Sequence, residues 1–212
     1  MVTKTVDYSD AELTYEGYLA LPGDAAPIGL VVVGHAWGGQ SDHERDVCDR
    51  LSQMGYAAFA YDIYGKGNRA SDPAECEALM NPLVGDRAKL QSRLALSIAT
   101  AQKETGIGAD KTVGIGYCFG GGVVLDAARR GEPLDAVVSF HGALNTKTPA
   151  REGVTKTPML IEHGNGDTMV TAQNVADFKK EMDAAKADYK FVGIDGAKHG
   201  FTNPDADKLS HG

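Results

Sequence analysis

The chain has 212 residues, which is enough for one sizeable hydrophobic core and hardly enough for two, so we expect a single domain over residues 1–212. Its 29 acidic residues outnumber 21 basic ones, and the formal net charge of −8 argues against nucleic acid or an anionic membrane surface as a partner. This charge balance makes a small molecule the expected partner. The longest apolar runs are far shorter than the ~20 residues that span a bilayer, so no membrane span is expected.

Short β-rich runs alternate with longer helical patterns, which predicts a mainly parallel, twisted sheet flanked by helices. Two early strands, at 2–8 and 13–22, are expected to pair antiparallel at the edge of this sheet. The other predicted elements follow in chain order. The first half has a strand at 28–33, a helix at 42–54, a strand at 57–61, a short helix from Asp72 and a long helix at 86–105. The second half has a strand at 112–117, a helix at 121–130, strands at 136–140 and 159–162, a helix at 171–185 and a strand at 189–194.

The cysteine content and the first residues indicate a reducing compartment. Three cysteines are too few for a disulfide framework, and the start MVTKTVDYSD lacks the apolar core of a secretion signal. We therefore expect a cytoplasmic protein.

The stretch TVGIGYCFGGGVV places a cysteine between a predicted strand and a predicted helix. Gly116 and Gly120 flank Cys118 in a G-x-C-x-G pattern, which is typical of a nucleophile elbow with sulfur in place of oxygen. The start of the following helix favours negative charge on a thiolate. The alternative is a buried structural cysteine near a tight turn. Cys48 and Cys76, by contrast, lie in helical patterns and are expected to be core or surface thiols.

A thiol nucleophile needs a base and an acid that orients the base. Asp167 follows the strand at 159–162, and His199 follows the last strand, where parallel sheets bind their ligands. The order Cys118, Asp167, His199 is that of the nucleophile, acid and histidine in α/β-hydrolases. The alternatives are an exposed aspartate that caps the helix at 171 and an ordinary loop histidine.

The segments GYAAFAYDIYGKG, GIGYCFGG, VVSFHG, HGNGDTMV and KHGFTNP resemble dienelactone hydrolases, also called carboxymethylenebutenolidases. The resemblance runs over nearly the whole chain. It implies an α/β-hydrolase fold and hydrolysis of a lactone or ester by a Cys-His-Asp triad, without a metal or cofactor. In this chain the triad would be Cys118, His199 and Asp167.

Acyl transfer also requires donors for the oxyanion and a pocket for the substrate. The expected donors are the backbone N–H groups of Phe119, after the nucleophile, and Ala36, in the loop after Val33. The candidates for lining a substrate pocket follow strand ends or begin the long helix, and for each of them simple packing or solvation is the competing interpretation: His35, Trp37, Tyr64, Arg87 and His141.

The chain departs from the family pattern at places that matter for substrate and shape. The resemblance puts His35 where muconate-lactone hydrolases carry a glutamate, and Asn203 where they carry an arginine, so the sequence leaves open whether dienelactone itself is a substrate. No amphipathic helix is predicted after His199, so the domain is expected to lack the family's final helix. We expect the end of the chain to be poorly ordered or to lie on a partner. The protein is expected to be a monomer, or a weak oligomer if the apolar strip that the final helix would cover stays exposed.

Other functions remain open at this level. Glutamine amidotransferases also use a G-x-C-x-G elbow, but they would place glutamate where Phe201 stands. An esterase or thioesterase of unrelated substrate and a non-catalytic ligand-binding protein are further alternatives. His35, His141 and His163 could converge on a metal, but no H-x-x-x-H spacing occurs, so no metal is expected.

Overall fold

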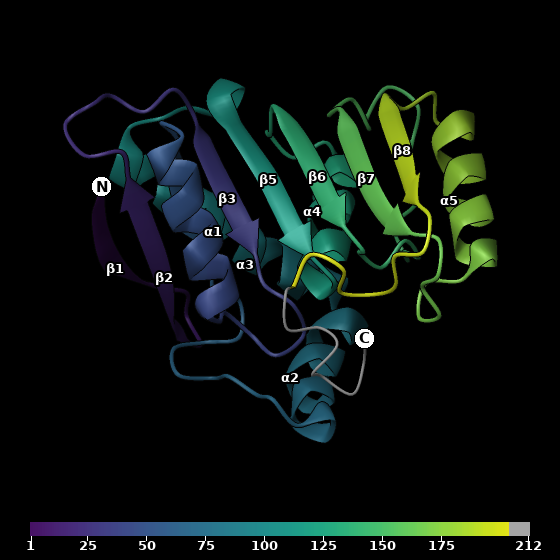
Figure 1. Ribbon diagram of the computed structural model, residues 1–212, viewed down its shortest axis with the longest axis horizontal. Helices are drawn as coiled ribbons and strands as arrows, with labels where there is room; N and C mark the ends of the chain where they lie inside the picture. The colour runs from purple at the N-terminus through teal and green to yellow at the C-terminus, as the bar shows by residue number, and fades with distance from the viewer. Residues whose placement is uncertain (204–212) are drawn as a thin grey trace.

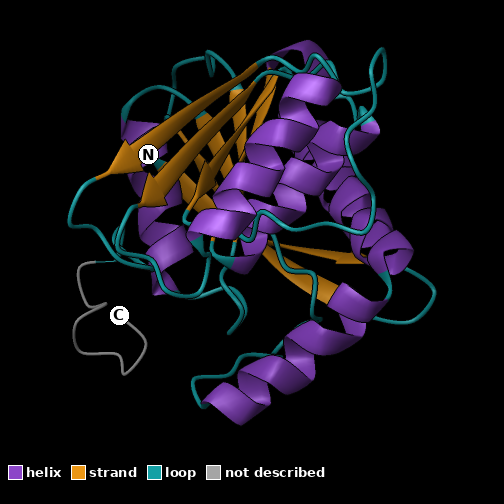
Figure 2. Cartoon of the chain, turned by 90° about the vertical axis from the view of Figure 1, so that its right-hand side faces the viewer, coloured by secondary structure: helices purple, strands orange, loops and turns teal. Residues whose placement is uncertain are grey.

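The computed structural model describes residues 1–203, which form an eight-stranded sheet with helices on both faces (Figures 1 and 2). The strand order is β1-β2-β4-β3-β5-β6-β7-β8, and only the first two strands run antiparallel to their neighbours. The strands are β1 (Val2–Ser9), β2 (Thr14–Leu21), β3 (Leu30–Gly34), β4 (Ala57–Ala60), β5 (Thr112–Tyr117), β6 (Ala136–Phe140), β7 (Met159–Gly164) and β8 (Tyr189–Ile194).

Helices cover the sheet unequally. Helix α1 (Asp42–Gln53) lies on one face, against β2, β3 and β4. Helices α3 (Arg87–Thr105) and α4 (Phe119–Arg130) lie on the other face, and α5 (Ala172–Ala184) continues this layer at the β8 edge. Helix α2 (Pro73–Gly85) lies beyond the carboxyl edge of the sheet (Figures 1 and 2), where it packs against α3 and places Leu83 in the main core.

The two faces of the sheet bury separate apolar clusters. The larger cluster packs α3, α4 and α5 against the sheet, with Phe59, Leu125 and Phe178 nearly or completely buried. The smaller cluster lies under α1 and includes Val33 and the thiol-bearing Cys48. Short, wholly apolar strands such as LVVVG follow from this double coverage, because strands buried on both faces need no polar alternation.

Local sequence signals set the helix ends. Ser41 and Glu44 form a capping box at the start of α1, and Thr171 and Asn174 form one at the start of α5. Helices α3 and α4 both end at a left-handed glycine, Gly106 and Gly131.

The predicted α/β architecture is confirmed, including the antiparallel pair at the edge, and most predicted elements agree with the structure within two residues. The largest difference is α2, which runs for 13 residues where a short helix was expected. Asp72 caps it and Pro73 begins it, and Pro82 is tolerated near its end, where the missing N–H interrupts few helical bonds.

No helix within residues 1–203 is long and apolar enough to cross a membrane. The expectations about the end of the chain, including the missing final helix, concern residues 204–212 and so lie outside the described residues.

Candidate active site

Cys118 occupies the turn that joins β5 to α4. Its backbone has φ of 51°, in a region that residues other than glycine rarely adopt. The Cys118 N–H donates to the Phe140 carbonyl at 3.0 Å, and its own carbonyl accepts from Gly122 at 3.3 Å. A strained backbone conformation held by neighbouring strands is a feature of functional sites.

The glycines of the elbow are required by close backbone contacts. A Cβ on Gly116 would lie 2.2 Å from the Gly120 carbonyl oxygen, and a Cβ on Gly120 would lie 2.6 Å from the Gly34 carbonyl. The Gly120 N–H also donates to the His35 carbonyl at 3.0 Å. The elbow therefore packs closely against the end of β3 and is hydrogen-bonded to the residue that follows it.

We expect Gly120→Ala to lower the free energy of unfolding by about 1–3 kcal/mol, because the added methyl group meets backbone that cannot move aside. Urea denaturation measures this. Gly85→Ala is the matched control, since a Cβ at this helical position meets nothing within 4 Å and alanine favours a helix. Equal stability of Gly120→Ala and the native protein would contradict the close packing of the elbow.

Asp167 and His199 meet at the carboxyl edge of the sheet. The segment after β8 runs back along this edge toward β5 (Figure 1), which brings His199 near the elbow. His199 Nδ1 lies 2.8 Å from Asp167 Oδ2, and Asp167 Oδ1 accepts from the N–H groups of Met169 and Val170 at 2.8 and 3.0 Å. The Asp167 carboxylate is thus held from both sides.

Asp167 and Cys118 both raise the pKa of His199. Burial alone would lower the pKa of His199, but the Asp167 hydrogen bond and the adjacent Cys118 sulfur outweigh it and raise the pKa to about 10. Burial would raise the pKa of Asp167, yet its bonds to His199 and to backbone N–H groups lower it. His199 Nε2 makes no well-formed hydrogen bond within residues 1–203 and is therefore free for a proton exchanged with sulfur.

The two expected oxyanion donors lie beside the elbow. Within residues 1–203, the N–H groups of Phe119 and Ala36 have no hydrogen-bond acceptor. The Ala36 carbonyl accepts from Gly39 at 3.2 Å and lies 2.7 Å from His35 Nδ1. These bonds fix the loop after β3 while leaving the Ala36 N–H unpaired.

His35 and Tyr64 are buried supports of this loop rather than open contacts for a ligand. The His35 ring is completely buried, 4.7 Å from the Tyr64 ring and 6.3 Å from the Phe119 ring. Because a carbonyl oxygen only accepts, His35 Nδ1 carries the proton, and burial lowers the pKa of the ring. Tyr64 donates to the Trp37 carbonyl at 2.9 Å, and half-buried Trp37 packs against the main core.

His141 lies directly beside the proposed base. Its ring centroid is 5.0 Å from that of His199, and its Nε2 lies 2.8 Å from Thr202 Oγ1. Burial and the neighbouring His199 lower the pKa of His141 to about 3, so this ring stays neutral. The sequence analysis missed Thr202 and Phe201, which contact His141 and hold the His199 loop; their place in KHGFTNP was the available signal.

Arg87 is partly exposed and is paired with a buried carboxylate. Its Nη1 donates to Asp126 Oδ2 at 3.0 Å, and the opposite oxygen of Asp126 accepts from Arg129 at 3.0 Å. Arg129 is fully buried and also binds both carboxylate oxygens of Glu181 at 2.9 Å and the Leu144 carbonyl at 2.7 Å. Arg87 therefore belongs to an ion-pair network that joins α3, α4 and α5.

No group of three or more His, Cys, Asp or Glu side chains within the described part of the chain is arranged to hold a metal ion. His35 and His163, considered as ligands from the sequence, lie in separate clusters, His35 against Tyr64 and His163 against Phe191.

Comparison with known proteins gives a consistent result. The sequence model of the dienelactone hydrolase family matches residues 15–211. Protein usf of Aquifex pyrophilus is 28% identical over 202 residues, which are 93% of this chain and 86% of that protein. A solved dienelactone hydrolase-like promiscuous phosphotriesterase from metagenomic libraries has a TM-score of 0.90 at 29% identity, over 98% of this chain and 87% of its own. The structure named m3DLH gives a TM-score of 0.91 at 30% identity, over 100% of this chain and 88% of its own.

Proposed function

Because the chain belongs to the dienelactone hydrolase family and has its α/β-hydrolase fold, we propose that it hydrolyses a lactone or small carboxylic ester with Cys118 as the nucleophile. The observation that carries this proposal is the 2.8 Å hydrogen bond between Asp167 and His199, formed beside a cysteine on a strained strand-to-helix turn. The proposed nucleophile, base and orienting acid follow three separate strands, whose carboxyl ends lie at one edge of the sheet.

The first half of the reaction forms a thioacyl enzyme. His199 Nε2 takes the proton of Cys118, and the thiolate attacks the ester carbonyl carbon. Asp167 accepts from His199 Nδ1–H, which fixes the tautomer and stabilises the imidazolium. The raised pKa of His199 supports this transfer, because the proton remains on the imidazole while the sulfur is negative.

The oxyanion of the tetrahedral intermediate is stabilised by the unpaired N–H groups of Phe119 and Ala36. Donors that are fixed before reaction lose nothing to reorganisation, and removal of one typically costs ~3 kcal/mol of transition-state stabilisation. His199 then protonates the leaving oxygen and activates the water that releases the acid.

The surroundings of the site favour a substrate without a carboxylate group. Arg87, the candidate cation, is bound to Asp126; His35 is buried and neutral; and Asn203 carries no charge. We therefore expect uncharged small esters or lactones to react faster than dienelactone, which carries a carboxylate.

A trapping experiment tests the function. Native protein mixed with p-nitrophenyl acetate should release a burst of nitrophenol equal to one per active site if deacylation is slower than acylation. After an acid quench and digestion, mass spectrometry should locate one acetyl group on the peptide that contains Cys118. Acetyl groups on other residues only, or steady turnover that survives alkylation of Cys118 with iodoacetamide, would contradict a thioacyl enzyme. An inert protein that still binds small esters would favour the non-catalytic alternative.

A further inference from the structure

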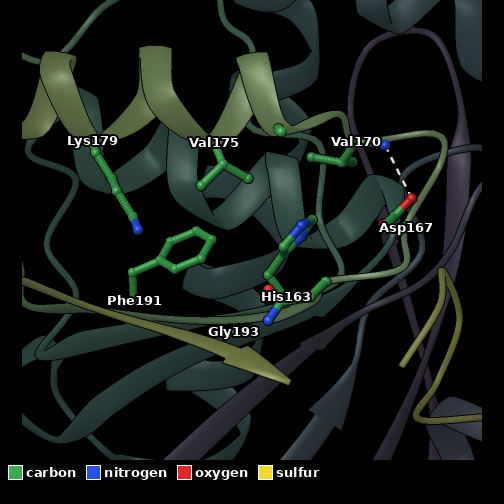
Figure 3. Close-up of a pocket in the computed structure, with 9 residues that line it drawn as sticks. His163, Asp167, Val170, Val175, Lys179, Phe191 and Gly193 are labelled. Carbon is green, nitrogen blue, oxygen red and sulfur yellow. Dashed lines mark hydrogen bonds between the residues drawn. The ribbon is translucent and has the colours of Figure 1, made fainter. Parts of the chain in front are cut away.

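A groove of about 350 Å³ lies between α5 and the carboxyl ends of β7 and β8 (Figure 3). Asp167 stands at one end and Lys179 at the other, with His163 between them. The proposed mechanism uses Asp167 through its bond to His199 and assigns nothing to the groove. Its volume is at the lower end of the range for small-molecule sites, which is about 300–1,000 Å³.

His163 is a buried polar side chain that points into this groove. Its residue is only 5% exposed, and its ring nitrogens make no hydrogen bond within residues 1–203. Its ring lies 5.6 Å from that of Phe191 and is directed toward α5 (Figure 3). Burial lowers the pKa of His163, so the neutral ring offers one N–H donor and one acceptor. The ring nitrogens are open to the groove, so water or a bound ligand there can pair with them.

Lys179 supplies an uncompensated positive charge at the other end. Its Nζ lies 4.4 Å from the centroid of the Phe191 ring, and it forms no ion pair with a carboxylate in the described part of the chain. The side chains of Val170 and Val175 complete an apolar wall between the two polar groups (Figure 3).

We propose that this groove is a second binding site, which takes a small organic monocarboxylate with an apolar body. The carboxylate lies near Lys179 and accepts from His163, and the apolar body packs against Val170, Val175 and Phe191. The Asp167 carboxylate lies at the opposite end of the groove from Lys179 (Figure 3), and its negative charge is paired with the His199 imidazolium at 2.8 Å, so it repels a carboxylate beside Lys179 only weakly. An acid of this class is also the product of ester hydrolysis. The identification of the ligand as a reaction product rests on the proposed function, whereas binding of a carboxylate in the groove does not.

Titration with sodium benzoate tests the site by ¹H–¹⁵N NMR. The protein is first alkylated with iodoacetamide at Cys118, so that the catalytic centre is blocked. The amide signals of Val170, Val175, Lys179 and Gly193 should shift together and saturate, with a dissociation constant of about 1 mM. Benzyl alcohol, which has the same ring and no charge, should bind several-fold more weakly.

Matched variants separate the groove from general attraction to the helix. Lys179→Gln should weaken benzoate binding about three- to fivefold, as expected for loss of a partly exposed ion pair. Lys180→Gln removes the neighbouring charge on the exposed face of α5 and should leave binding unchanged. Val175→Phe extends into the groove and should abolish binding, with native folding checked by its dispersed NMR spectrum.

Three results would overturn the proposal: no saturable shift near the groove, equal affinities of Lys179→Gln and native protein, or benzyl alcohol binding as tightly as benzoate. Because the readout is binding to alkylated protein, a failure of the hydrolase proposal would leave these results interpretable.

Discussion

Replacement of Cys118 by alanine is expected to lower kcat/KM for p-nitrophenyl acetate by at least about 10⁴-fold. The reason is that neither of the remaining thiols, Cys48 and Cys76, can replace it, because both are buried. The unpaired N–H groups of Phe119 and Ala36 would remain, so a small residual rate above that of water is expected.

Initial-rate measurements on Cys118→Ala and native protein, purified side by side, give this ratio. Cys48→Ala is the control, because this thiol lies in the cluster under α1 and its removal should leave the rate nearly unchanged. Matching thermal unfolding curves would show that the variants are folded. Equal activity of Cys118→Ala and native protein would remove the chemical basis of the proposed function.

Asp167→Asn is expected to lower kcat by about 10³–10⁴-fold while the fold is retained. An amide can present its NH₂ group to His199 Nδ1, which would place the imidazole proton on Nε2, where it cannot accept from Cys118. The substitution also removes the negative charge that helps to raise the pKa of His199.

The pH profile separates this effect from a general loss of structure. In the native protein the His199 pKa of about 10 lets the imidazolium persist well above pH 7, and activity should decline only as pH approaches that value. In Asp167→Asn the alkaline limb should move to lower pH. Asp195→Asn, on the exposed loop that follows β8, is the control and should keep the native profile.

The same pKa determines how stability depends on pH. Because the folded-state pKa of His199 lies above the ordinary value near 6.5, its interactions stabilise the fold fully below about pH 6.5. That contribution is lost as pH rises through about 10. Unchanged alkaline stability and an unchanged pH profile in Asp167→Asn would contradict a charged Asp167–His199 pair.

Local patterns predicted the tight turn at Cys118 and the proximity of Asp167 and His199, because each depends on a short segment and one general rule. Glycines on both sides of Cys118 indicated a tight turn, and the structure shows contacts that exclude a Cβ there. Asp167 and His199 each follow a strand, and parallel strands bring their carboxyl ends to one edge.

Partners distant in sequence could not be predicted in the same way. Asp126, which binds Arg87, is 39 positions away and belongs to another helix, so its proximity depends on how α3 and α4 pack. The inward orientation of His35 likewise depends on the Tyr64 and Phe119 rings, which come from other segments. No periodicity or motif contains such information, because tertiary packing alone brings these groups together.

The buried Arg129 network gives the fold a characteristic response to heat. Its guanidinium has exchanged water for Asp126, Glu181 and the Leu144 carbonyl, at a large cost in lost hydration. Hydration of charged groups carries a negative entropy, so that cost shrinks as temperature rises, while the hydrophobic contribution per unit area levels off. The junction of α4 and α5 should therefore gain relative strength on warming, and melting should begin in parts of the chain that are held by apolar contacts alone.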